Sequence, residues 1–195
     1  MKKAIIIGSG IAGIATSLRL KALGYDVKVF ESNEYPGGKL TSFKLGPYRF
    51  DSGPSLLTMP HFIDELFDLF NEDPKDRFLY KKKDISCNYY WEDGIVLNAF
   101  SDKLRFSKEV EDKLGVKSKN VLNYLNKAKK KYDLTKSVFL EKSLHKLRTF
   151  YSKDVLLGLL NLNIFQINKS LNDVNLSELK EPHLVQLFNR FATYN

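Results

Sequence analysis

Three glycines near the N-terminus have the spacing of a diphosphate-binding loop. Gly8, Gly10 and Gly13 form a Gly-x-Gly-x-x-Gly pattern directly after the β-branched run of residues 3–7. In such a loop the first glycine permits a tight turn, the second lets the backbone approach a diphosphate, and the third lets the next helix pack closely. The unpaired amides and the dipole at that helix start favour an anion. The spacing therefore predicts a site for the diphosphate of a dinucleotide.

A carboxylate follows at the sequence position from which it could contact the ribose of such a dinucleotide. Glu31 comes directly after the apolar run of residues 27–30 and lies 18 residues beyond Gly13. A carboxylate at the end of the second strand accepts hydrogen bonds from the ribose hydroxyls, and it repels a 2′-phosphate, which argues against NADP. The alternative interpretation is a strand–helix–strand unit that binds no ligand.

No other residues have the spacing of a catalytic or metal site. His61, His145 and His183 are far apart and match no metal-ligand pattern, so we expect surface or capping roles for them and no metal. Cys87 is the only cysteine, which excludes an internal disulfide and fits a reducing cytoplasm. The catalytic residues therefore stay unassigned.

The elements that would position the glycines follow from the apolar pattern. Residues 3–7 are typical of a buried parallel strand, the apolar residues from Ile11 to Leu23 have helical spacing, and Gly24 suits the helix end. Residues 27–30 form the second strand. Further along, the pattern predicts a hairpin over 42–51, a helix from Pro60 and a second hairpin over 85–100.

The rest of the chain is predicted to be helical and basic. From Ser107 the pattern is helical. We expect a long helix with one face formed by Val121, Leu122, Leu125, Ala128 and Tyr132, an apolar helix over 155–162 and a last helix from Pro182. The net charge is +8, and residues 103–153 hold 15 Lys and Arg against 5 Asp and Glu. This segment either faces phosphates of lipid or nucleic acid, or is a solvated lysine-rich face.

The N-terminal segment also carries a family resemblance. Residues 5–38 read IIIGSGIAGIATSLRLKALGYDVKVFESNEYPGG and closely resemble the N-terminus of the flavoprotein family that includes amine oxidases and carotenoid desaturases. The resemblance implies that FAD is the cofactor and that Gly37, Gly38 and Lys39 lie at its phosphates. Lys39 stands where arginine is commoner in that family. The lysine ammonium is a point charge, so it lacks the two parallel hydrogen bonds that an arginine guanidinium can donate to a phosphate.

Two further segments narrow the resemblance to phytoene desaturases and related carotenoid desaturases. Phe50 to Ser55, followed by Met59 and Pro60, is similar to their F-D-x-G-P-[ST] segment, which lies near the flavin, and Phe188 to Asn195 resembles the end of their helical region. The residues that we expect at the cofactor are Gly8, Gly10, Ala12, Gly13, Glu31, Gly38, Lys39, Leu40, Gly53, Pro54 and Ser55.

The resemblance implies a fold class and a domain division. We expect an α/β chain in which a Rossmann-like strand–helix–strand unit with an incomplete sheet precedes a mostly helical region. Residues 1–77 would be the N-terminal part of an FAD-binding domain, and residues 78–195 a hairpin plus a helical region facing substrate and membrane. The residue pattern itself changes from mixed strand and helix to helix alone near residue 101, which makes that position the best candidate for a domain boundary. Only two parallel strands are identifiable, which predicts a fragment that lacks a C-terminal half and binds FAD weakly alone.

The implied activity is the FAD-dependent desaturation of a carotenoid precursor, as in a phytoene desaturase or a hydroxycarotenoid 3,4-desaturase. The implied partners are a lipophilic polyene and an anionic membrane surface that residues 103–153 contact, rather than nucleic acid. A cytoplasmic, peripherally membrane-associated protein is expected. The alternatives are a retinol saturase-like or amine oxidase-like oxidoreductase, or a non-catalytic remnant that binds membrane.

Overall fold

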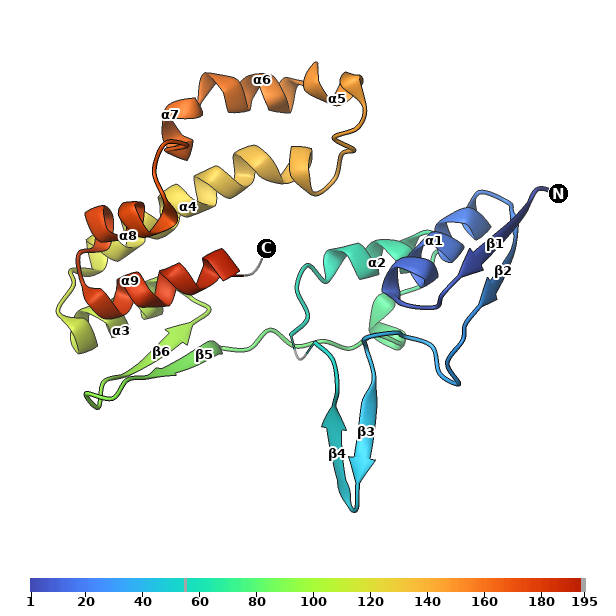
Figure 1. Cartoon of the computed structure of the whole chain (residues 1–195), viewed down its shortest axis with the longest axis horizontal. Coiled ribbons are helices and arrows are strands. Elements are labelled where there is room, and N and C mark those ends of the chain that lie inside the picture. Colours follow the sequence, from blue (N-terminus) through green and yellow to red (C-terminus); the bar gives the residue numbers. More distant parts are fainter. Residues whose placement is uncertain (55, 194–195) are drawn as a thin grey trace. The chain divides into compact units, whose positions relative to one another are not determined.

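The computed structural model describes residues 1–54 and 56–193, and they form two compact units (Figure 1). Unit 1 covers residues 1–81 and unit 2 begins at residue 82. The resemblance implies a division after residue 77, and the pattern boundary near residue 101 falls inside unit 2. The assignment of the two parts to cofactor and to substrate or membrane stays a prediction.

Unit 1 starts with a Rossmann-like strand–helix–strand unit. Strand β1 (Lys3–Ile7) pairs in parallel with β2 (Asp26–Phe30), and helix α1 (Ile11–Ala22) connects them. Parallel strands need such a crossover because a tight turn cannot join them. All three elements agree with the predicted ones, and the α/β class is confirmed.

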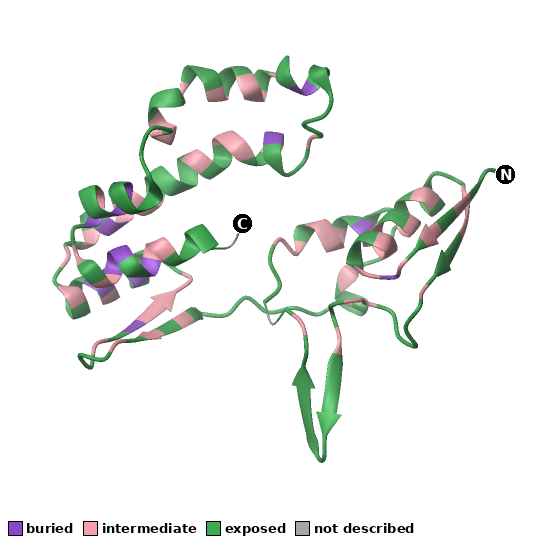
Figure 2. Ribbon diagram, viewed as in Figure 1, coloured by how far each residue is buried: buried purple, intermediate pink, exposed green. Residues whose placement is uncertain are grey.

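The expectation that β1 is buried on both faces is wrong. Ala4 and Ile6 are half-buried, whereas Ile5 and Ile7 are 67% and 90% exposed (Figure 2). Successive side chains of a strand point to opposite faces, and Ile6 lies on the α1 side, where its Cγ2 is 3.5 Å from the position of a Cβ on Gly13. The helix therefore covers one face of this two-stranded sheet, and Ile5 and Ile7 lie on the other.

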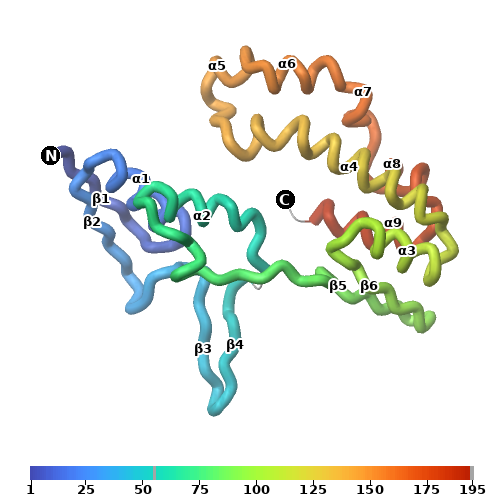
Figure 3. The backbone as a smooth tube through the Cα atoms, turned by 180° about the vertical axis from the view of Figure 1, so that it is seen from behind, coloured from blue at the N-terminus to red at the C-terminus, as the bar shows by residue number. Residues whose placement is uncertain are grey.

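The remainder of unit 1 is a hairpin and two short helices. Strands β3 (Ser42–Leu45) and β4 (Tyr48–Asp51) pair antiparallel, and every residue in them is exposed. Both views show this hairpin extending away from β1, α1 and β2 (Figures 1 and 3). Helix α2 (His61–Asp68) begins after Pro60, as predicted, and the 3₁₀ helix η1 (Pro74–Asp76) follows.

Unit 2 is a hairpin followed by helices. Strands β5 (Ile85–Tyr90) and β6 (Val96–Phe100) pair antiparallel, and Gly94 adopts a φ of +86° in the turn that Asp93 and Gly94 predicted. The helices are α3 (Lys103–Leu114), α4 (Ser118–Phe139), α5 (Leu147–Phe150), α6 (Lys153–Leu160), α7 (Leu162–Phe165), α8 (Leu171–Leu179), α9 (Pro182–Asn189) and the 3₁₀ helix η2 (Arg190–Thr193).

The core of unit 2 joins residues that are distant in the sequence. Strand β6 and helices α3, α4, α8 and α9 contribute its buried side chains (Figure 2). These are Leu97, Phe106, Val110, Val121, Leu179, Leu184, Val185 and Leu187. The hairpin and helices α3, α4, α8 and α9 therefore share one hydrophobic core.

Three parts of the helical region differ from the sequence prediction. Helix α3 begins at Lys103 rather than at Ser107, because the Asp102 side chain accepts a hydrogen bond from the Arg105 amide and caps the helix there. The helix predicted over 155–162 is two helices that meet at Asn161, where φ is −112°. Helix α8 was not predicted, although Ser170 and Asp173 form a capping box at its start.

Helices α5 and α6 return along α4 (Figures 1 and 3). We call residues 144–162, which include these two helices, the helical arm. No helix in the described residues combines the length and the apolar character needed to cross a membrane.

Candidate dinucleotide-binding site

Two of the three loop glycines are required by the fold itself. Gly8 adopts a φ of +95°, which side chains rarely allow, and its amide donates a hydrogen bond of 2.7 Å to the Phe30 carbonyl oxygen. A Cβ on Gly13 would lie 2.0 Å from the Gly8 carbonyl oxygen. The first glycine therefore permits the turn, and the third permits the close approach of α1 to the end of β1.

The second glycine has a different role. Gly10 has an ordinary φ of −67°, and an added Cβ there would meet no atom within 4 Å. It is the N-cap residue of the 12-residue helix α1, which has no side-chain cap and no acidic residue in its first turn. The space at Gly10 and the uncapped amides beside it, including that of Ala12, suit the diphosphate of a dinucleotide.

A second glycine turn lies against the first. The Gly37 amide donates a hydrogen bond of 2.8 Å to the Ser9 carbonyl oxygen. Gly38 has a φ of +59°, and a Cβ on it would come within 3.2 Å of the Gly10 Cα. Residues that are 28 positions apart in the sequence, Gly10 and Gly38, are therefore adjacent at the start of α1.

The Glu31 carboxylate also points to the glycine loop. Its Oε2 atom accepts hydrogen bonds from the Ser9 amide at 2.7 Å and from the Ser9 Oγ at 2.9 Å. Its Oε1 atom accepts from the Asn33 amide at 3.0 Å and from the Asn33 Nδ2 at 2.9 Å. The hydrogen bonds from Asn33 and Ser9 amides lower the Glu31 pKa to about 2, so this carboxylate is ionised at neutral pH.

Three more of the expected residues lie near this loop region. A Cβ on Gly53 would come within 1.8 Å of the Lys39 carbonyl oxygen, so these two segments are in close contact. Leu40 lines an apolar pocket of about 810 Å³ together with side chains of α1 and α2. Pro54 follows Gly53 in the chain, and Ser55 lies outside the described residues.

Sequence reasoning missed Ser9 and Asn33. They hold the Glu31 side chain between them, and Ser9 is buried in the loop. The available signal was weak, because a small polar residue between two glycines or after an acidic residue is common in turns. Their role depends on the distance between β2 and the glycine loop, which the sequence does not state.

The comparisons agree with this geometry. The family model described as an NAD(P)-binding Rossmann-like domain matches residues 6–72. Over its whole length the chain is 51% identical to a 1-hydroxycarotenoid 3,4-desaturase of Flavobacterium sp. (strain P99-3), of which it covers 40%. This chain is a relative of the carotenoid desaturases.

Other carotenoid desaturase relatives and related enzymes are more distant. A 4,4′-diapolycopene oxygenase of Methylomonas sp is 29% identical over 99% of this chain and 38% of its own length. A phytoene desaturase of Fusarium fujikuroi is 27% identical over 83% of this chain and 29% of its own length. The chain thus spans about two fifths or less of the length of these three relatives.

Proposed function

We propose that this chain is the FAD-binding portion of an oxidoreductase that desaturates a carotenoid precursor. The observation that carries the proposal is the convergence of Gly10, Gly38 and Glu31 at the start of α1. The relatives named for carotenoid desaturation support the substrate class. The resemblance of residues 37–39 and 50–55 to flavoprotein segments favours FAD over NAD.

In this proposal the chain's own residues bind and orient the adenosine diphosphate half of the cofactor. The uncapped α1 amides and Gly10 receive the diphosphate, and Lys39 adds positive charge. The Glu31 carboxylate already accepts five hydrogen bonds, from Ser9, Ser32 and Asn33, so ribose hydroxyls would take the place of the Ser9 Oγ and the Asn33 Nδ2. FAD, when bound, supplies a hydride acceptor for CH–CH oxidation.

The first test is FAD binding by the 195-residue chain and by Glu31→Gln. We expect saturable quenching of FAD fluorescence and competition by ADP, because Gly10, Gly38 and Glu31 would contact the adenosine diphosphate half. Glu31→Gln should weaken binding by about tenfold, the loss expected when one hydrogen bond to a charged group goes.

The matched control for this test is Glu92→Gln, an exposed carboxylate in unit 2. It should bind FAD as the unchanged chain does. Failure of ADP to compete, or equal FAD affinity in Glu31→Gln and the unchanged chain, would contradict the assigned geometry. Flavin colour after purification would also separate the enzyme from the alternative of a non-catalytic remnant.

We further propose that the helical arm contacts an anionic membrane surface. Its large apolar side chains are exposed, although such residues normally gather in the core. They are Leu144, Leu147, Phe150, Tyr151, Leu156, Leu157, Leu159, Leu160 and Leu162. Lys146, Arg148 and Lys153 lie in the same segment. Apolar side chains next to cations are the combination that binds the interface of an anionic bilayer.

A further inference from the structure

Three lysines of α4 line a pocket of about 280 Å³ in unit 2. Lys127, Lys130 and Lys131 are three and four residues apart, so they share one side of the helix. The opposite wall comes from α7, the turn after it and α8. The volume is just below the range of about 300–1,000 Å³ that drug-sized ligands occupy, which suits a small ionic group.

The charge in this pocket is only partly balanced. The Lys127 Nζ lies 3.0 Å from a carboxylate oxygen of Glu178, the one acidic residue of the lining. The partly buried Lys131 Nζ instead donates at 2.9 Å to the Oε1 atom of Gln166, which is a neutral amide. The lining therefore contains three lysines and one carboxylate, and the ammonium of Lys131 contacts a neutral amide rather than an anion.

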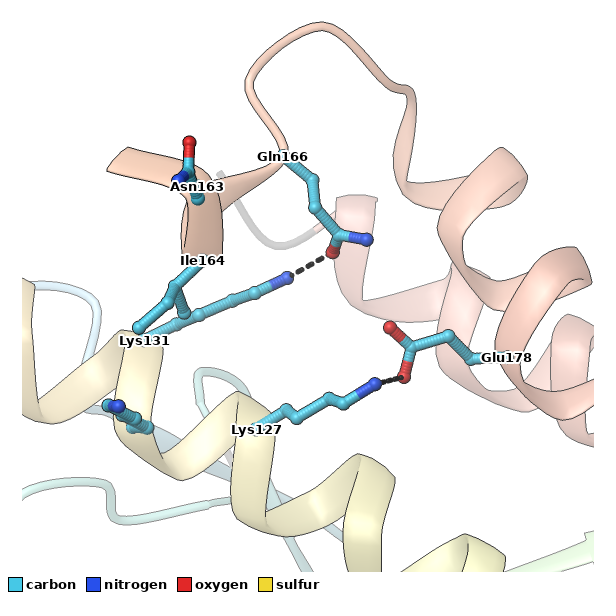
Figure 4. A pocket seen from close by; sticks show the side chains of 7 residues that line it. Lys127, Lys131, Asn163, Ile164, Gln166 and Glu178 are labelled. Atoms are coloured by element: carbon cyan, nitrogen blue, oxygen red, sulfur yellow. Dashed lines mark hydrogen bonds and ion pairs between the residues drawn. The ribbon is translucent and has the colours of Figure 1, made fainter. Parts of the chain in front are cut away.

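Two lysines reach across this space to polar side chains. Figure 4 shows Lys127 and Lys131 extending from α4 toward Glu178 and Gln166, whereas the Asn163 side chain on α7 points away from both lysines. Gln166 adopts a left-handed φ of +51°, a conformation that non-glycine residues seldom adopt. Its side chain has one amide oxygen, which Lys131 uses, and an NH₂ group that can donate.

We propose that this pocket binds a phosphate group, with Lys130 and Lys131 supplying the charge and the amide of Gln166 supplying a further hydrogen bond. Phosphate has several strong acceptor oxygens and a charge near −2 at neutral pH, which matches the excess positive charge and the donors. The phosphate comes either from a soluble compound or from a lipid head group. This inference concerns unit 2 and does not depend on the dinucleotide proposal.

The test is a titration of the 195-residue chain with inorganic phosphate at constant ionic strength. Binding is measured from the NMR chemical-shift changes of the backbone amides. We expect saturable shifts around residues 127–131 and 163–166. Lys131→Gln and Lys130→Gln should each weaken binding by at least about tenfold, the loss expected for a hydrogen bond to a charged group. The matched control Lys119→Gln replaces an exposed lysine of the same helix outside the pocket and should leave binding unchanged.

A second arm uses phosphatidylcholine vesicles that contain phosphatidic acid or, at equal surface charge, phosphatidylglycerol. A preference for phosphatidic acid that disappears in Lys131→Gln supports a phosphate site whose ligand is a lipid head group. Binding of inorganic phosphate without that preference supports a phosphate site whose ligand is a soluble compound. The proposal is overturned if folded Lys131→Gln, checked by circular dichroism, binds phosphate as the unchanged chain does, or if neither probe binds. Lys131→Gln should retain FAD binding, so the two proposals can fail separately.

Discussion

At the residue scale, Gly10 and Gly13 share a loop but are needed for different reasons. Gly13→Ala would place a Cβ 2.0 Å from the Gly8 carbonyl oxygen, whereas Gly10→Ala would place one in open space. We expect Gly13→Ala to lower the free energy of unfolding by about 1–3 kcal/mol, as overpacking does. Gly10→Ala should change it by less than about 1 kcal/mol, because its φ is ordinary, but should reduce FAD affinity.

Thermal unfolding and FAD titration of the two glycine variants would check this prediction. The unchanged chain is the reference for both measurements. If Gly10→Ala binds FAD normally, the space over Gly10 is not the diphosphate site. If Gly13→Ala unfolds at the same temperature as the unchanged chain, the stability of the fold does not depend on the close approach of α1 to β1.

Also at the residue scale, His183 connects the start of α9 to the β5–β6 turn. Its Nδ1 lies 2.7 Å from Glu181 and its Nε2 lies 2.9 Å from Asp93, while Trp91 packs edge-on at 4.8 Å between ring centroids. Both ring nitrogens face carboxylates, which only accept, so the ring is favoured in its doubly protonated form. The hydrogen bond to Glu181, and next that to Asp93, raise the His183 pKa above 6.5 despite partial burial.

The raised pKa predicts how stability depends on pH. A group whose pKa is higher in the folded state stabilises fully below its unfolded value, near 6.5, and loses that contribution as pH rises through its folded value. The unfolding temperature of the chain should therefore exceed that of His183→Gln most at pH 6 and less at pH 9. A difference that is constant or grows with pH would show that His183 is not held as a cation. His145→Gln, outside this cluster, serves as the control.

At the element scale, α9 stabilises unit 2 while α6 leaves its leucines outside the core. Leu184 of α9 is fully buried, whereas Leu160 of α6 is 73% exposed. Leu184→Ala should lower the free energy of unfolding by about 2–5 kcal/mol, because it leaves a cavity in the core. Leu160→Ala should change it by less than about 0.5 kcal/mol.

Urea unfolding, followed by circular dichroism, measures both leucine variants. Equal effects would mean that the exposed face of α6 is covered in solution. That outcome would also weaken the proposal that these leucines contact a membrane, because protein would already cover them.

At the scale of the whole molecule, the excess positive charge and the exposed leucines occur in the same part of the chain. Residues 103–153 carry the basic excess, and the helical arm overlaps them. We expect the chain to co-sediment with anionic vesicles and not with neutral ones. Binding should fall as salt rises, because the Debye length shortens from about 8 Å at 0.15 M to about 3 Å at 1 M.

Replacing Leu156 and Leu160 by serine should reduce vesicle binding by at least about tenfold, since each buried CH₂ contributes about 0.8 kcal/mol. The matched control is Leu45→Ser, which changes an exposed leucine of the β3–β4 hairpin. Binding that is insensitive to lipid charge, or equally reduced by the control, would contradict a role for the helical arm. The solvated lysine-rich face would then be the better interpretation.

The sequence by itself determined the local elements and their order. The β-branched run before Gly8, the helical spacing after Gly10 and the Asp93–Gly94 turn encode β1, α1 and the second hairpin, and the structure has all of them. These features depend on interactions between near neighbours, such as tight turns and side-chain periodicity. The same local information identified Glu31 as the closing residue of β2.

Only the tertiary structure decided which distant residues meet. It placed Gly38 beside Gly10, bonded Ser9 to Glu31 and opposed Lys131 to Gln166 across 35 positions of chain. It also exposed Ile5, which the sequence pattern assigned to a buried strand. Such contacts depend on how helices and strands pack and on which side-chain rotamers that packing allows. The spacing of residues along the chain does not encode these contacts, because packing brings together residues that are far apart in the sequence.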